Sequence, residues 1–269
     1  MTPLLALFVL AQATSNPADW SRAEREAFLS SARIVQFRGL STGITNSERA
    51  TLERDGIRHD AHVQHIDVYK MQYQTVMGTE LNFKDTWKFN MAAYKMDRLL
   101  GMSMIPATVE RHTESKDASV TWWIDDAAMT EGQRMQKKLE PPDLDRWNKQ
   151  MWVLRVFDQL ISNTDRNLGN VVIDKSWNIW LIDHTRAFRA GKNLLSQKNL
   201  DRCDRSLLAS LRKLDHTEVT LALSPFVGKM EIDGLMARPD KIIAFFEKKI
   251  KQQGEGAVLY DYLATNQRK

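Results

Sequence analysis

Short runs of alternating hydrophobic and polar residues occupy the first third of the chain, a pattern typical of β-strands. Residues 34–37 and 50–54 form two such runs, and residues 61–67 form a third. Asp55–Gly56 separates the second run from the third, and this dipeptide favours a tight hairpin turn. The pattern predicts a small antiparallel β-rich unit.

A helical spacing of apolar residues follows these runs and predicts a helix that ends at Gly101. Asp85 is the expected N-cap residue of this helix. The apolar positions that recur about once per turn are Trp87, Met91, Tyr94 and Leu99.

A second and longer helical pattern begins after Pro141–Pro142, where Asp143 is the expected N-cap. Its apolar residues are Leu144, Trp147, Met151, Leu154, Phe157 and Ile161. Two runs before it, 107–111 and 120–124, have the composition of strands, and 207–214 and 239–251 are expected as further helices.

The long helical pattern leads into a predicted hairpin that carries polar residues with chemical potential. Val171–Ile173 and Ile179–Ile182 are apolar runs, and the residues between them are typical of a turn. A hairpin of this register brings Asn170 and Asp183 together at its open end. Oxygen ligands of this kind, without nearby cysteine, favour Mg²⁺ or Mn²⁺.

Asp165 lies just before this hairpin and can accept a proton from an attacking hydroxyl group. The spacing from Asp165 to Asn170 is that of a kinase catalytic loop, Asp-x-x-x-x-Asn. The alternative is that these residues serve only as turn residues and that Asp183 caps the next segment.

The segment Asn163–Phe188 resembles the catalytic region of the atypical kinases, a group that includes phosphatidylinositol 3- and 4-kinase-like, HipA-like and secretory-pathway casein kinase families. Ile182–Thr185 stands where typical protein kinases carry Asp-Phe-Gly. The resemblance implies that Asp165 is the catalytic base, that Arg166 and Asn163 support the loop, and that the metal ligands are Asn170 and Asp183.

The resemblance also implies a two-lobed α+β fold, with a β-rich N-lobe at residues 20–125 and a mainly helical C-lobe at residues 126–269. Adenine would pair with backbone groups around Trp123–Asp126. A loop rich in glycine and small hydroxyl residues, with Gly39, Gly43 and Thr45, would cover the phosphates. On local grounds this loop is equally typical of an ordinary hairpin.

The chain departs from the kinase pattern at two charged positions. Gln64 stands where a lysine would contact the phosphates, and Asn90 stands where a glutamate would position that lysine. His62 lies on the same strand face as Gln64, in the expected adenine pocket. Three explanations remain open: a catalytically silent module, a different alignment, or another lysine, for which Lys70 is favoured over the later Lys84 and Lys88.

Composition limits the function classes. A chain of 269 residues with 43% hydrophobic content can bury one large core or two smaller ones. A net charge of +4 without a long basic run gives no indication of nucleic-acid binding. Cys203 is the single cysteine, which excludes an intrachain disulfide and a thiolate metal cluster. We expect a monomer.

The first residues resemble a secretory signal peptide. Residues 3–10 are apolar, and residues 11–13 form a small-x-small site that predicts cleavage after Ala13. The apolar run is too short to span a bilayer. The alternative is an N-terminal helix of the folded protein. We expect a secreted, periplasmic or secretory-pathway protein on the first interpretation and a cytoplasmic one on the second.

The sequence therefore predicts an ATP- and Mg²⁺-dependent phosphotransferase whose acceptor is a protein, a lipid or a small molecule. A nucleotide- or partner-binding module without fast chemistry is the alternative from another class. A nucleotidyl transferase built from the same parts is also open.

Overall fold

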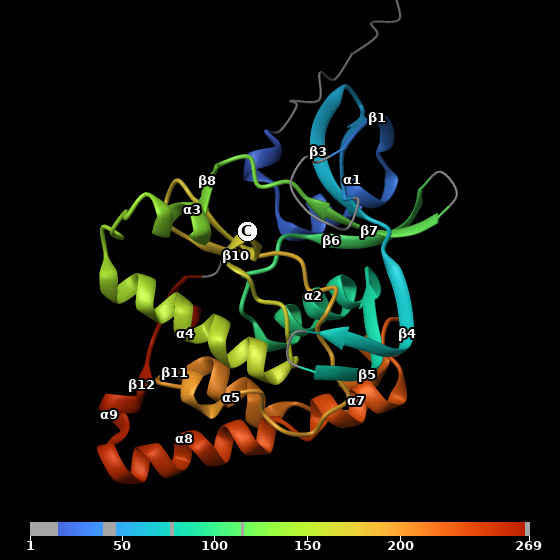
Figure 1. Cartoon of the computed structure of the whole chain (residues 1–269). Coiled ribbons are helices and arrows are strands. Elements are labelled where there is room, and N and C mark those ends of the chain that lie inside the picture. The colour runs from blue at the N-terminus through green and yellow to red at the C-terminus, as the bar shows by residue number, and fades with distance from the viewer. Residues whose placement is uncertain (1–15, 40–46, 76–77, 114–115, 267–269) are drawn as a thin grey trace, which may run out of the picture.

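The computed structural model describes residues 16–39, 47–75, 78–113 and 116–266. The predicted signal peptide, Gly43 and Thr45 lie outside these ranges. A β-rich part formed by the first strands lies above a larger part made mainly of helices (Figure 1). No helix in the described ranges has the length and apolar character needed to cross a bilayer.

A five-stranded antiparallel sheet forms the β-rich part, with the strand order β1-β2-β3-β7-β6. The strands are β1 (Arg33–Gly39), β2 (Glu48–Arg54), β3 (Ile57–Gln64), β6 (Thr108–Thr113) and β7 (Lys116–Trp122). Asp55 and Gly56 connect β2 to β3, and both have the positive φ angles (54° and 77°) that the predicted tight turn requires. The three predicted N-terminal strands are confirmed.

Helix α1 (Arg22–Ser31) packs on this sheet and was not predicted. Its first turn carries a capping box, in which Ser21 and Glu24 satisfy each other's backbone N–H groups. Phe28 of α1 packs between Trp20 and Trp122 and closes the smaller of the two apolar cores. The capping box was the sequence signal that could have revealed this helix.

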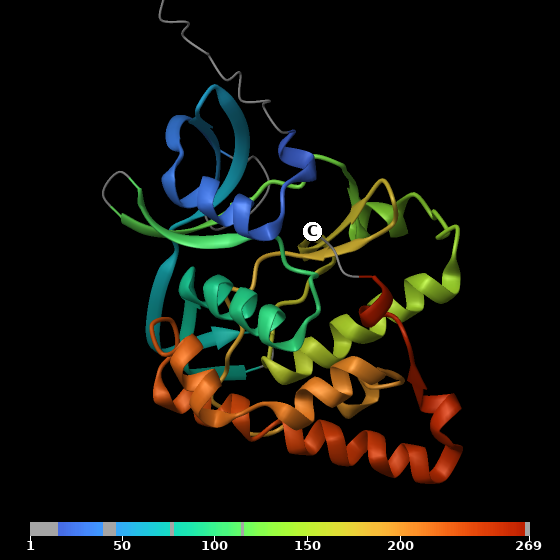
Figure 2. The same ribbon diagram turned by 180° about the vertical axis from the view of Figure 1, so that it is seen from behind.

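A two-stranded ribbon, β4 (Asp67–Thr75) paired with β5 (Gly78–Thr86), leaves the sheet after β3. Both views show it descending to lie beside the helical part (Figures 1 and 2). The sequence analysis placed a helix start here instead, with Asp85 as its N-cap.

That N-cap assignment is wrong, because Asp85 belongs to β5 and α2 (Lys88–Leu100) begins only after Trp87. The backbone N–H of Thr86 donates to the carbonyl of Thr185, which keeps the chain extended up to this point. The predicted end of α2 is confirmed, since Gly101 takes a left-handed conformation with φ of 67°.

The larger core unites α2 with the helices of the second part. Asp143 caps α4 as predicted, by accepting the N–H of Arg146. The helices of this part are α3 (Glu131–Gln136), α4 (Leu144–Leu160), α5 (Arg205–Lys213), α6 (His216–Leu223), α7 (Lys229–Met236), α8 (Pro239–Gln253) and α9 (Glu255–Val258).

A three-stranded sheet lies between the two parts, and it contains the predicted hairpin. Its strands are β8 (Ala127–Thr130), β9 (Val171–Asp174) and β10 (Ile179–Leu181), in the order β10-β9-β8. Leu181 pairs with Val171, so the open end of the hairpin falls next to Asn170, as the sequence predicted. A short parallel pair, β11 (Cys203–Asp204) with β12 (Leu259–Tyr260), joins the C-terminal region to this part.

Arg238 fixes the segment that follows the hairpin. Its side chain is fully buried and donates to the backbone carbonyls of Leu160 (2.6 Å), Arg189 (3.1 Å) and Gly191 (2.5 Å). Burial lowers the pKa of the Arg238 guanidinium to about 10, so the group stays charged at neutral pH. Its hydrogen bonds join the end of α4 to residues 189–191.

We expect Arg238→Met to lower the free energy of unfolding by about 2–4 kcal/mol, because it removes the donor for buried carbonyl groups. Urea denaturation measures this change. Arg212→Met is the matched control, since Arg212 forms an exposed pair with Glu247 and its loss should cost less than about 1 kcal/mol. Equal losses in the two variants would contradict the role of Arg238.

Candidate active site

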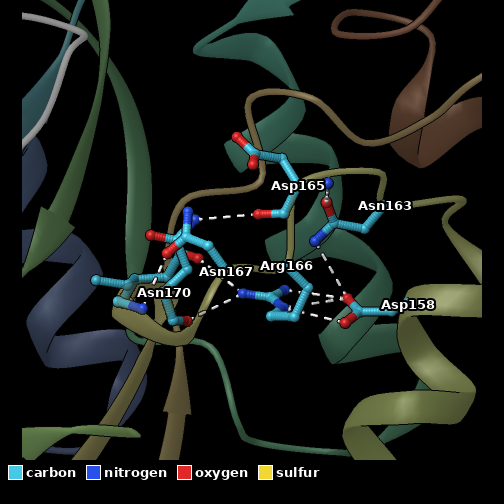
Figure 3. Close-up of polar contacts among 8 residues, drawn as sticks. Asp158, Asn163, Asp165, Arg166, Asn167 and Asn170 are labelled. Atoms are coloured by element: carbon cyan, nitrogen blue, oxygen red, sulfur yellow. Dashed lines mark hydrogen bonds and ion pairs between the residues drawn. The ribbon is translucent and has the colours of Figure 1, made fainter. Parts of the chain in front are cut away.

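The guanidinium group of Arg166 joins three segments of the site (Figure 3). Its Nε pairs with a carboxylate oxygen of Asp158 on α4 at 3.1 Å. Its Nη1 donates to the carbonyls of Asn170 and Ile182, each at 3.0 Å. Arg166 therefore ties the loop after α4 to the residues that directly precede and follow the β9–β10 hairpin.

The loop that carries Asp165 is further held by amide side chains. The Asn163 side chain accepts the backbone N–H of Asp165 at 3.0 Å and donates to Asp158 at 3.1 Å. Asn170 donates from its side chain to the backbone carbonyl of Asp165 at 3.3 Å (Figure 3). Asn167 caps the short 3₁₀ helix Leu168–Asn170, which directs the chain from Asp165 into β9.

Asp183 follows β10 in a left-handed backbone conformation with φ of 51°, which is uncommon for a residue other than glycine. Its Oδ1 accepts the hydroxyl of Thr185 at 3.0 Å. The N–H of Ile182 donates to the carbonyl of Asn170 at 3.2 Å, which keeps the Asn170 and Asp183 positions adjacent. Hydrogen bonds before and after Asp183 thus stabilise its left-handed backbone conformation.

Asn90 of α2 also holds the Asp183 segment. Its side-chain oxygen accepts the N–H of His184 at 2.7 Å, and its amide nitrogen donates to Ser119 of β7 at 3.1 Å. A neutral amide can make both bonds at once, whereas a carboxylate cannot donate. The residue at the expected glutamate position therefore links α2 to the sheet and to the hairpin.

Asp165 lies among other charged groups. Burial raises the pKa of the Asp165 carboxyl, and the negative charges of Asp183 and Asp85 raise it further. Arg186 opposes this shift from 3.7 Å. The net elevation makes Asp165 a stronger base than an exposed aspartate, which suits a group that must accept a proton.

Asn170 and Asp183 can hold a divalent cation. The amide nitrogen of Asn170 faces Asp165, and Oδ1 of Asp183 faces Thr185, so each residue has another side-chain oxygen available. Within the described ranges, no three His, Cys, Asp or Glu side chains gather as a metal site.

The other predicted cofactor-binding residues are more dispersed. Gly39 is the last residue of β1 and pairs with Glu48. Gln64 is buried at the end of β3, where its side-chain oxygen accepts the N–H of Ile66 at 2.9 Å. Lys70 is exposed on β4, with its ammonium group 4.8 Å from the centre of the Tyr73 ring. The sequence analysis predicted that Lys70 contacts the phosphates, but no described interaction joins Lys70 to Asp165, Asn170 or Asp183.

The other two lysines that could replace the strand lysine are engaged elsewhere. Lys84 forms an ion pair with Glu231 of α7, and Lys88 pairs with Asp67 at 3.0 Å. None of the three lysines has a described contact with the Asp165 loop.

His62 lies on β3 and is half-buried. Burial lowers the pKa of its imidazole, and the negative charge of Asp183 acts in the opposite direction. The segment after β7 turns towards β8, and the carbonyl of Asp126 accepts the N–H of Lys175 at 3.0 Å. The predicted adenine-binding segment thus runs alongside the β9–β10 hairpin.

A groove of about 710 Å³ opens beside the Asp165 loop. Thr164, the neighbour of Asp165, lies in its wall. The rest is formed by β5, by residues 188–191 and by the N-terminal end of α7. The groove gives a second molecule access to the vicinity of Asp165.

Comparison with known proteins identifies the architecture. No protein-family model matches the chain, and no curated protein matches it in sequence. Solved structures do match in fold. The Fam20 protein of hydra, solved with sugar, has a TM-score of 0.64 at 14% identity, over 87% of this chain and 90% of that one.

The chain has an atypical kinase fold. The Golgi casein kinase with Mn and ADP bound matches with a TM-score of 0.62 at 14% identity, over 90% of this chain and 80% of that one. The Helicobacter pylori proinflammatory kinase CtkA matches with a TM-score of 0.53 at 12% identity, over 84% of this chain and 98% of that one. The α+β kinase-like fold class is confirmed, and the resemblance to atypical kinases holds at the level of the fold.

Within this kinase-like fold, the sequence analysis missed the role of Asp85. The residue is buried on β5 and binds Nε of Arg186 through Oδ2 at 2.9 Å. The signal was the alternation of β5, in which Phe83 and Asp85 both face inwards. Reading Asp85 as a helix cap concealed that alternation.

We expect Asp165→Asn to raise the unfolding temperature at pH 7. The pKa of Asp165 is higher in the folded protein than in the unfolded chain, so the folded state binds more protons at pH values between these two pKa values. The free energy of unfolding of the parent therefore falls as pH rises through that range, and Asp165→Asn avoids this decrease because an amide does not ionise. Thermal unfolding should show that the increase in unfolding temperature is larger at pH 7 than at pH 4.

Asp145→Asn is the control for this measurement, since Asp145 is exposed on α4 and pairs with Lys149. It should lack the gain at pH 7. A destabilisation of Asp165→Asn that is equal at both pH values would show that the charges around Asp165 are wrongly assigned.

Proposed function

We propose that the protein is a phosphotransferase that transfers the γ-phosphoryl group of ATP, with Mg²⁺ or Mn²⁺, to a hydroxyl acceptor. The observation that supports this most is the convergence of Asp165, Asn170 and Asp183 around the Arg166 hydrogen bonds. The Golgi casein kinase of the same fold was solved with Mn and ADP, which supports the choice of cofactors.

Asp165 acts as the base in this proposal. The acceptor hydroxyl gives its proton to the Asp165 carboxylate as its oxygen forms a bond to the γ-phosphorus. The bond between the γ-phosphorus and the bridging oxygen breaks, and ADP leaves with the electron pair. Asn163 and Arg166 hold the loop that orients Asp165.

Asn170 and Asp183 would hold the metal ion, which neutralises phosphate charge when bound. The phosphate loop would include Gly39, Gly43 and Thr45, and Gln64 would line the same side of the cleft. The acceptor would approach through the groove beside Thr164.

Two alternatives on the same fold stay open from the sequence analysis. The neutral pair Gln64 and Asn90 favours a nucleotide- or partner-binding module without fast chemistry. Transfer of the AMP group is the second alternative, because the same ligands can serve an inverted nucleotide. The retained acids argue for chemistry, since a binding module has no need of a base.

The solved structures of similar fold also support a proposal for the cellular compartment of this protein. The Golgi casein kinase belongs by its name to the secretory pathway, which supports the predicted export of this chain. We propose that residues 1–13 direct export and are removed by cleavage after Ala13.

Purified protein should transfer label from γ-labelled ATP and none from α-labelled ATP, in a reaction that requires Mg²⁺ or Mn²⁺. We expect Asp183→Ala to weaken metal-dependent nucleotide binding by about tenfold or more, because it removes a metal ligand. Asp165→Asn should keep nucleotide binding and lower the transfer rate by about 10²–10⁴-fold.

Asp145→Ala, an exposed substitution on α4, is the matched control and should behave as the parent protein does. Transfer from α-labelled ATP would establish the nucleotidyl transferase instead. Binding without transfer would establish the silent module, and Asp183→Ala binding equal to that of the parent would refute the ligand assignment.

A further inference from the structure

Among the described residues, no hydrogen bond or ion pair joins a lysine to Asp165, Asn170 or Asp183, whereas one arginine lies beside Asp165. The sequence analysis aligned Gln64 with the kinase lysine, and Lys84 and Lys88 are paired with Glu231 and Asp67. Arg186 is the cation that forms an ion pair with the candidate base Asp165.

The two ends of the Arg186 guanidinium have different surroundings. Nε is fixed by Asp85 at 2.9 Å, whereas Nη1 faces Asp165 at 3.7 Å, which is longer than a hydrogen bond. The side chain remains 34% exposed, and its guanidinium carbon lies 5.4 Å from the centre of the Phe83 ring. One end is anchored, and the other end can bind a group that arrives next to Asp165.

The buried position of Asp85 is unfavourable for folding stability. The residue is 4% exposed, and its Oδ1 has no hydrogen-bond partner among the described residues. Burial of a carboxylate with an unsatisfied oxygen is unfavourable unless a cation compensates it. Proteins commonly retain such an arrangement where function requires it. The pair therefore holds a cation at this point of the site.

The neighbouring charges make Arg186 the better placed of two arginines. Asp165, Asp183 and Asp85 contribute negative charge on this side of the loop. Arg189 is nearby, but it pairs with Glu80 at 2.9 Å and donates to the carbonyl of Lys84 at 3.0 Å. These two contacts, and a third with the Phe83 ring at 5.3 Å, engage the Arg189 side chain with residues of β5.

We propose that Arg186, anchored by Asp85, is a catalytic residue that binds the transferred phosphoryl group and supplies the positive charge which the strand lysine supplies in other kinases. A guanidinium fork suits this task, because it can bind two phosphoryl oxygens at once. The proposal rests on the phosphotransferase function and explains how Gln64 and Asn90 are compatible with it.

The test compares Arg186→Met, Arg186→Lys and the double variant Asp85→Asn/Arg186→Met with the parent. We expect Arg186→Met to lower the rate of γ-phosphoryl transfer by about 100-fold or more. It should also abolish the tighter binding of a non-hydrolysable ATP analogue relative to ADP in the presence of Mg²⁺. Arg186→Lys should recover part of the transfer rate and part of this difference in affinity.

The double variant separates catalysis from structure. Arg186→Met leaves Asp85 buried without its cation, so its unfolding temperature should fall, and Asp85→Asn in the same chain should restore it. We expect the double variant to regain stability and to remain slow. If it regains the transfer rate as well, Arg186 has a structural role only and the proposal is wrong.

Arg212→Met, which removes an exposed pair on α5, is the control for the loss of an arginine. An active parent with an Arg186→Met rate within twofold of it would overturn the role of Arg186 and leave the phosphotransferase function intact. A parent that neither transfers phosphoryl nor prefers the analogue over ADP would refute the function itself, and Arg186 would lose its role with it. If the parent binds without transfer, loss of that preference in Arg186→Met still supports phosphoryl binding by Arg186.

Discussion

The hydrogen bonds of Arg166 are the interaction on which the candidate site depends. A single guanidinium group pairs with Asp158 on α4 and donates to Asn170 and Ile182, which precede and follow the β9–β10 hairpin. Arginine can serve this purpose because its rigid fork offers several donors and its charge persists at any physiological pH. Loss of these bonds would separate the loop of Asp165 from the hairpin that presents Asn170 and Asp183.

Around this centre, the β4–β5 ribbon connects the two parts of the molecule. It begins after β3 of the large sheet and reaches the segment that follows the hairpin through Asp85, Lys84 and Thr86. The same ribbon lines the groove beside Thr164. One element thus contributes an anchor for Arg186 and a wall for the approach of an acceptor, so the relative position of the two parts affects both.

The site gathers acids and compensates them with few cations. Burial and the charges of Asp183 and Asp85 raise the pKa of Asp165, which helps a base and costs folding stability at neutral pH. Gln64 and Asn90, the neutral residues at the positions expected for a lysine and a glutamate, add no further charge to the site. Asn90 uses one side-chain amide for both contacts, accepting the N–H of His184 and donating to Ser119.

Local sequence determined the strands on either side of Asp55–Gly56, the capped start of α4, the end of α2 at Gly101 and the hairpin that brings Asn170 to Asp183. Each depends on hydrophobic periodicity, on a cap or on a turn, and these act over a few residues. Local sequence could not locate the β4–β5 ribbon, because its strands are largely exposed and lack a continuous apolar face. Nor could it decide the partner of Arg186, since Asp85 lies 101 residues away in the chain and meets it only across the packed ribbon. Tertiary structure alone decided that contact, because the energy of an ion pair depends on distance in space and on the exclusion of water.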